Sequence, residues 1–122
     1  MAVKSSLKFY QKGLELAESG QYEEAFGYLR KHLESCPSDG QAWNDAGTVL
    51  YCLGQVDEAI KYFKKAKGLC SESELGGVYW NLFEAYLDGG YPNFAAGLFD
   101  EMERFAIPVS YTHLTLPTTP YV

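Results

Sequence analysis

The sequence has few residues of the kinds that build metal centres, disulfide frameworks or nucleic-acid surfaces. Only three cysteines and two histidines occur in 122 residues, and the cysteines form no Cys-x-x-Cys pair, which fits neither a zinc site nor a disulfide framework. We expect Cys36, Cys52 and Cys70 to be reduced thiols that act as small apolar side chains. Lysine and arginine number 10 against 16 aspartates and glutamates, so the net charge of −6 argues against a nucleic-acid partner.

Long apolar runs are absent as well. No stretch approaches the length needed to span a bilayer, and the first residues, MAVKSSLKFYQKG, lack the apolar core of a signal peptide. We therefore expect a cytoplasmic protein without a membrane partner. The sequence also shows no Ser/His/Asp order, no phosphate-binding glycine loop and no carboxylate pair at a convincing spacing. It consequently predicts no enzyme, no cofactor and no metal site.

Apolar residues, in contrast, make up 47% of the sequence and aromatic residues 16%, which is enough for a well-packed core. Two apolar stripes recur at helical spacing within residues 43–66 and are separated by Gly54. Because neither helix could bury its stripe alone, the segment predicts a helical hairpin. Gly47 and Ala59 are small enough to let the two helices approach closely.

This hairpin pattern occurs three times. Phe9, Trp43 and Tyr79 begin the three copies, at intervals of 34 and 36 residues. The period resembles the tetratricopeptide repeat, whose pattern has an aromatic residue and Leu-Gly in its first helix and Ala, Phe and a closing Pro in its second. The resemblance covers roughly residues 6 to 107. Positions that recur in the first two copies are Phe9 and Trp43, Gly13 and Gly47, Leu16 and Leu50, Gly20 and Gly54, and Ala25 and Ala59.

The resemblance implies an all-α solenoid of three helical hairpins that stack as a right-handed superhelix. We expect one tetratricopeptide repeat domain over residues 1–108, with repeats at about 6–39, 40–73 and 76–108. Ser38 with Gln41 and Ser71 with Glu74 have the spacing of capping boxes. From these caps and the glycine and proline stops, we expect helices at about 4–18, 22–35, 38–53, 56–69, 71–88 and 92–105.

Several residues depart from the family pattern. His32 stands where a small alanine is preferred, and we expect it to be partly buried near the next repeat. Phe83 replaces the glycine of the third copy, so we expect the third hairpin to be splayed. Four lysines follow one face of the fourth predicted helix, and we interpret them as a solvated convex surface. They are Lys61, Lys64, Lys65 and Lys67.

Stacked hairpins leave their first helices along a concave groove, and we expect a peptide or protein segment to bind there. Asn44 would hold the backbone of an extended peptide, while Tyr10, Tyr51 and Trp80 would pack its side chains. The alternative is that these aromatic residues, Trp80 above all, fill space between adjacent first helices. The predicted partner-binding residues are Tyr10, Leu14, Asn44, Thr48, Tyr51, Trp80 and Glu84.

One branch of the family holds the terminal carboxylate of chaperone tails with lysines, asparagines and an arginine. In this sequence the matching positions carry only neutral or acidic residues, so we do not expect that function. These positions are Tyr10, Leu14, Asp45, Gly77 and Asn81.

The last residues differ in character from the repeats. The string VSYTHLTLPT, which follows Pro108, resembles a translated reading frame of the mosaic-end adapter used in transposon-based sequencing libraries. We expect residues 109–122 to be a non-native or disordered tail and the natural protein to be longer. The alternative is a natural, strand-prone tail that packs on the last helix. Truncation would uncover the helix at 93–106, through Phe94, Leu98 and Phe105, and would favour self-association.

Taken together, these patterns predict a non-catalytic protein–protein interaction scaffold. The alternative is the N-terminal repeat region of a truncated larger enzyme, such as a glycosyltransferase. The sequence downstream of Pro108 would distinguish the two, because a catalytic domain there favours the enzyme and further repeats favour the scaffold.

Overall fold

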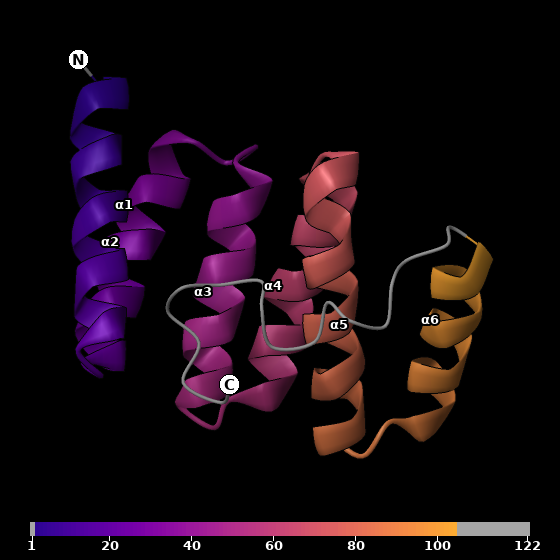
Figure 1. Ribbon diagram of the computed structural model, residues 1–122. Coiled ribbons are helices and arrows are strands. Elements are labelled where there is room, and N and C mark those ends of the chain that lie inside the picture. The colour runs from indigo at the N-terminus through magenta and orange to yellow at the C-terminus, as the bar shows by residue number, and fades with distance from the viewer. Residues whose placement is uncertain (1, 105–122) are drawn as a thin grey trace.

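The computed structural model describes the backbone of residues 2–104 and the side chains of residues 7–104. Within residues 2–104 the chain forms six helices and no strand, and every predicted helix is confirmed to within two residues at each described end. Figure 1 shows the helices following one another as a row of hairpins, which confirms an all-α repeat solenoid. The predicted tail at 109–122 lies outside the described residues. The helices are α1 (Ala2–Glu18), α2 (Tyr22–Ser35), α3 (Gly40–Cys52), α4 (Val56–Leu69), α5 (Glu72–Asp88) and α6 (Pro92–Arg104).

Each hairpin turns in the same way. Gly20, Gly54 and Gly90 all have a φ of 83°, a left-handed conformation that glycine adopts without steric cost. The residue after each glycine donates its backbone N–H to the carbonyl oxygen five residues earlier. These hydrogen bonds are Gln21 to Leu16 at 2.8 Å, Gln55 to Leu50 at 2.9 Å and Tyr91 to Tyr86 at 2.8 Å. The repeat seen in the sequence is therefore also a repeat of backbone geometry.

Glycines hold the two helices of the first and second hairpins close together. A Cβ built on Gly47 would lie 2.7 Å from Cε1 of Phe63, and one built on Gly13 would lie 2.9 Å from Cγ of Leu29. Both distances are far below van der Waals contact, so only glycine fits. Phe63 and Leu29 are fully buried in these positions, at 0% exposure. The close approach that the sequence predicted is confirmed.

The third hairpin is more open. Helices α5 and α6 pack less closely than the other two pairs, and Figure 1 shows α6 set apart from α5. Phe83 occupies the position of the missing glycine, and its ring lies 5.9 Å from that of Phe99 on α6. A bulky ring at this position keeps the two backbones apart, so the predicted splay is confirmed.

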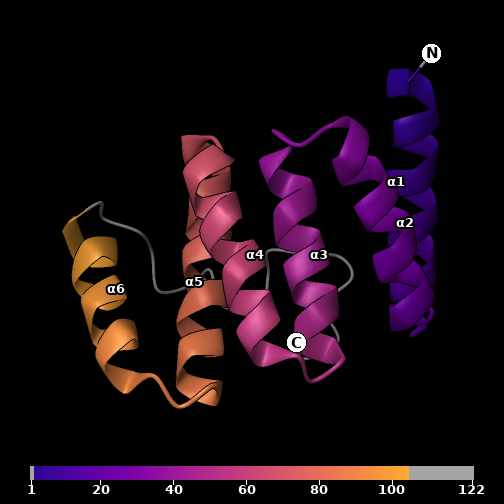
Figure 2. The same ribbon diagram turned by 180° about the vertical axis from the view of Figure 1, so that it is seen from behind.

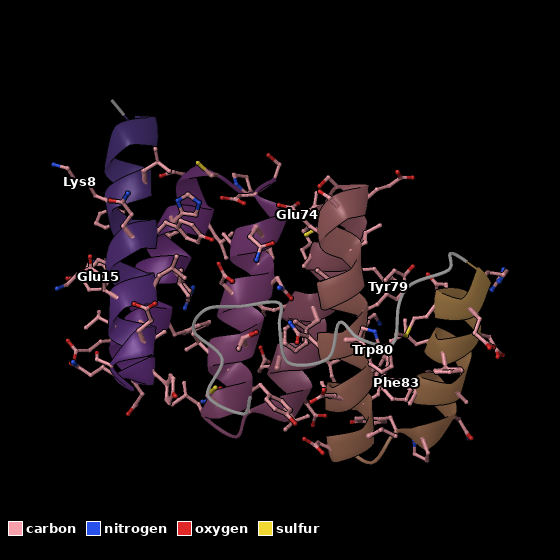
Figure 3. All side chains as sticks on the ribbon, viewed as in Figure 1. Lys8, Glu15, Glu74, Tyr79, Trp80 and Phe83 are labelled. Atoms are coloured by element: carbon pink, nitrogen blue, oxygen red, sulfur yellow. The ribbon has the colours of Figure 1, made fainter. Side chains whose placement is uncertain are left out.

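A polar contact ties α6 to the preceding helices. The Tyr79 hydroxyl donates to Oε1 of Glu101 at 2.5 Å, and Nζ of Lys67 lies 3.3 Å from the same oxygen. These bonds join α4, α5 and α6, and the hydrogen bond from Tyr79 lowers the pKa of the Glu101 carboxyl despite its partial burial. Figure 3 shows Tyr79 and Phe83 on the part of α5 that approaches α6.

The surface of α6 only partly matches the expected uncovered helix. Phe94 is 62% exposed, whereas Leu98 is buried at 5%. The expectation of exposure is therefore wrong for Leu98, which belongs to the core shared with α4 and α5. Phe105 lies outside the described residues. Self-association through this helix stays a prediction.

One predicted cap is confirmed and one is wrong. At the start of α5, the backbone N–H of Ser71 donates to Oε1 of Glu74 at 3.2 Å, as a capping box requires. At the start of α3, the cap is Asp39 and not Ser38, because Oδ1 of Asp39 accepts from the backbone N–H of Ala42 at 3.2 Å. The helix therefore begins two residues later than predicted, and Gln41 is free to bond elsewhere.

We expect Gly47→Ala to lower the free energy of unfolding by about 1–3 kcal/mol, because the new methyl group would overlap the buried ring of Phe63. Urea unfolding measures this change. Gly27→Ala is the matched control: a methyl group added there, on the exposed side of α2, would meet no atom within 4 Å, so we expect stabilisation of about 0.5–1 kcal/mol. Equal effects of the two substitutions would contradict the close approach.

Candidate functional site

The first helices of the three hairpins, α1, α3 and α5, form one face of the molecule. Helix α3 contacts both α1 and α5. Figure 1 shows these three helices towards the viewer, and Figure 2 shows α2 and α4 on the opposite side. We call the side formed by α1, α3 and α5 the inner face. This is the side of the molecule on which the sequence predicted a groove.

Side-chain hydrogen bonds join all three helices across the inner face. The Tyr10 hydroxyl on α1 donates to the carboxylate of Asp45 on α3. Nδ2 of Asn81 on α5 donates to Oδ1 of Asn44 on α3 at 3.1 Å. The three hairpins are therefore connected by polar contacts as well as by apolar packing.

The seven predicted partner-binding residues all lie on α1, α3 and α5, but they differ in exposure. Asn44, Thr48 and Trp80 are buried, at 1%, 0% and 6% exposure, and the Thr48 hydroxyl donates to the backbone oxygen of Asn44 at 3.2 Å. Trp80 belongs to the apolar core shared by α3, α4, α5 and α6, and its burial favours the space-filling interpretation of this residue. The other four, Tyr10, Leu14, Tyr51 and Glu84, are partly exposed. A role in partner binding stays a prediction for all seven.

Around Tyr10 lies a polar network that the sequence did not predict. The ring of Tyr10 stacks on that of His32, with centroids 5.0 Å apart, and Nε2 of His32 lies 2.7 Å from Oδ2 of Asp39. His32 is 1% exposed, more buried than expected, because stacking and this hydrogen bond satisfy the imidazole. The signal that could have found the network is Asp45, a carboxylate within the apolar stripe of α3.

Asp45 is the titratable centre of this network. It is 2% exposed, and burial raises the pKa of its carboxyl to about 7. Hydrogen bonds from Tyr10 and from Nε2 of Gln41, at 3.3 Å, oppose the rise, while the negative charges of Asp39 and Glu74 add to it. Burial and the charge of Asp45 also raise the pKa of the Tyr10 hydroxyl. A pKa of about 7 for Asp45 places the charge change of this network near neutral pH.

Among residues 7–104, no three His, Cys, Asp or Glu side chains gather where they could hold a metal ion. Cys36, Cys52 and Cys70 are free thiols, as predicted, and burial raises the pKa of Cys52 and of Cys70 to about 11, which favours the protonated thiol at neutral pH. None of the six helices is long and apolar enough to cross a membrane.

We expect Asp45→Asn to remove a pH-dependent loss of stability. Because the pKa is raised from 3.8 to about 7 on folding, the folded chain keeps a proton that the unfolded chain releases in this range. The contribution of the Asp45 carboxyl to the free energy of unfolding is complete below pH 3.8, the pKa of this group in the unfolded chain. It falls by at most about 4 kcal/mol as the pH rises towards 7. Asparagine does not titrate, and its oxygen can still accept from Tyr10.

Thermal unfolding of both chains from acid to neutral pH measures the effect. The melting temperature of the unchanged chain should fall relative to that of Asp45→Asn as the pH rises. Parallel pH profiles for the two chains would show that the Asp45 carboxyl does not titrate in this window.

Comparison with known proteins agrees with this architecture. The family model of the tetratricopeptide repeat matches residues 40–72, and that of the PPR repeat matches residues 81–107. The chain is 33% identical over 73 residues to the protein MJ0572 of Methanocaldococcus jannaschii, which covers 60% of this chain and 83% of that protein. It is 30% identical over 56 residues to the cytochrome c-type biogenesis protein CycH of Bradyrhizobium diazoefficiens, which covers 46% of this chain and 15% of CycH.

Solved structures of MamA are similar over a longer range. A MamA point mutant superposes with a TM-score of 0.72 at 27% identity, over 82% of this chain and 72% of that chain. The MamA structure MSR-1 C2 superposes with a TM-score of 0.68 at 29% identity, over 77% and 53%. Helix order, the three identical glycine turns and these similarities lead to one conclusion: the chain belongs to the tetratricopeptide repeat family.

Proposed function

We propose that this chain is a protein-interaction scaffold whose inner face holds an extended peptide or protein segment without acting on it chemically. The observation that carries the proposal is the alignment of α1, α3 and α5 along one face, joined by side-chain bonds. Tetratricopeptide and MamA-like folds are typically non-catalytic scaffolds, and stacked repeats present such a face to partners.

The composition of the inner face favours a segment with apolar side chains. Tyr10 and Leu14 on α1 and Tyr51 on α3 are partly exposed and offer aromatic and aliphatic surface. Asn44 and Asn81 are buried, at 1% and 5% exposure, and are hydrogen-bonded to each other, so they join α3 to α5 and offer a ligand little surface. The proposed ligand is therefore recognised mainly by a few large apolar side chains.

Charge on this face disfavours a ligand that ends in a carboxylate. Asp45 becomes negatively charged above about pH 7, and Glu84 on α5 adds a second carboxyl group that is partly exposed. A terminal carboxylate would meet repulsion on this face instead of the cations that bind it in the chaperone-binding branch of the family. An internal segment of a partner fits better.

The alternative, a repeat region within a larger enzyme, stays a prediction. The match to CycH covers only 15% of that protein, so a segment similar to these repeats occurs within a much longer chain. Nothing in the described residues favours a particular catalytic partner domain, and the binding proposal applies to the repeats in either setting.

A selection from a random twelve-residue peptide library, with the full chain as bait, tests the proposal. We expect Leu14→Ala combined with Tyr51→Ala to weaken the selected peptides by about tenfold or more, because two apolar contacts are lost. Both side chains are partly exposed, so helicity measured by circular dichroism should be unchanged.

Tyr28→Ala is the matched control, since Tyr28 is a partly exposed tyrosine on α2 of the opposite side. It should leave the affinity of the selected peptides unchanged. Binding at this face would be refuted if the selected peptides bound the inner-face variant as tightly as the unchanged chain. It would also be refuted if Tyr28→Ala reduced their affinity as much as the inner-face variant does.

A further inference from the structure

A hollow of about 410 Å³ lies between α4, the end of α5 and the start of α6. None of the seven residues predicted for the inner face lines it. Figure 2 views the molecule from the side on which α4 lies in front, with α5 and α6 next to it. The hollow is therefore separate from the inner face.

Three aromatic rings form one wall of the hollow. Tyr86, Tyr91 and Phe94 contact one another pairwise, with centroid distances of 5.6 Å for Tyr86 and Phe94, 6.0 Å for Tyr91 and Phe94, and 6.4 Å for Tyr86 and Tyr91. Phe94 is 62% exposed and Tyr91 36%. Clustered exposed rings are a costly surface to leave in water and suit a large apolar side chain.

A hydrogen bond between repeats holds this wall in place. The Tyr91 hydroxyl donates to Oδ1 of Asp57 at 2.8 Å, which ties the turn before α6 to the first turn of α4. The carboxylate of Asp57 is also part of the lining. The wall thus exists before any ligand binds, which reduces the entropic cost of binding.

The opposite wall is positively charged. Lys61 and Lys64 line the hollow from α4. Nζ of Lys61 lies 3.0 Å from Oε1 of Glu58. The two side chains are 72% and 50% exposed, so solvent screens this ion pair and Lys61 can exchange partners. Lys61 is paired with Glu58, and Asp57 already accepts from Tyr91. Lys64 is therefore the cation of the lining that is available to an anionic group.

We propose that this hollow is a second binding site, which takes a peptide segment with a large apolar side chain next to acidic residues. The apolar side chain lies against Tyr86, Tyr91 and Phe94, and the carboxylates pair with Lys61 and Lys64. A quaternary ammonium group, the other ligand that aromatic rings bind, is repelled by the two lysines.

Three synthetic peptides test the proposal in an NMR titration of the full chain. The probes are acetyl-Gly-Ser-Phe-Glu-Glu-Ser-Gly-amide and the same sequence with Gln-Gln or Lys-Lys in place of Glu-Glu. We expect the Glu-Glu peptide to shift the amide signals of Lys64, Tyr91 and Phe94 and to bind best. Its affinity should fall about five- to tenfold with Gln-Gln and be lost with Lys-Lys, and it should weaken as salt is added.

Two variants locate the site. Lys64→Glu should weaken the Glu-Glu peptide about tenfold and strengthen the Lys-Lys peptide, whereas Lys12→Glu, the same charge reversal on exposed α1, should change neither. Phe94→Ser should weaken the Glu-Glu and Gln-Gln peptides, and because Phe94 is 62% exposed, circular dichroism should show an unchanged fold.

Equal affinity of Lys64→Glu and Lys12→Glu for the Glu-Glu peptide would overturn the proposal, as would tighter binding of the Lys-Lys peptide to the unchanged chain. Sedimentation would reveal a third contrary result. A mass that rises with concentration and is restored to that of the single chain by Phe94→Ser would show that the rings bind a second copy of the chain instead.

Discussion

The structure depends on the contact between a glycine and a large buried side chain inside the first two hairpins. Gly47 lies against Phe63, and Gly13 lies against Leu29, at distances that leave no room for a Cβ. This contact sets how closely the two helices of a hairpin approach. Successive hairpins can then stack in a regular way, because each presents the same shape to its neighbour. The alignment of α1, α3 and α5, and with it the inner face, follows from this constraint.

The third hairpin shows what happens when the constraint is absent. Phe83 takes the glycine's place, and α6 packs less closely than α2 and α4 do in their hairpins. The Glu101 carboxylate, bonded to Tyr79 and Lys67, connects α6 through polar groups instead. It is at the start of this looser helix that the exposed ring of Phe94 and the hollow beside α4 occur. The replacement of the repeat's glycine by Phe83 thus coincides with the loosely packed α6 and the hollow at this end of the molecule.

Much of the fold could be predicted from the sequence because it depends on local periodicity. The glycine turns, the helices and the splay at Phe83 follow from spacing alone. Finer features depend on how hairpins are rotated against each other, which spacing does not encode. The bond between Tyr10 and Asp45 spans 35 residues, and the burial of Asn44 and Thr48 depends on what neighbouring helices supply. The cap at Asp39 was missed for a simpler reason, since Ser38 beside it is also a good capping residue.

The lysines of α4 match the predicted solvated surface at Lys61, Lys64 and Lys65, which are exposed, while Lys67 is partly buried. Lys65 lies 5.8 Å from the Trp43 ring, while Lys67 lies 5.5 Å from the Tyr79 ring and bonds Glu101. These two lysines stabilise contacts between helices through their charge and their alkyl chains. Lys61 and Lys64 instead line the hollow beside the aromatic rings. In a chain with a net charge of −6, the hollow is a place where lysines lie beside exposed rings, although Asp57 and Glu58 offset part of their charge. The inner face carries carboxyl groups and the hollow also carries ammonium groups, so the two proposed sites differ in the charge of the segment that each would favour.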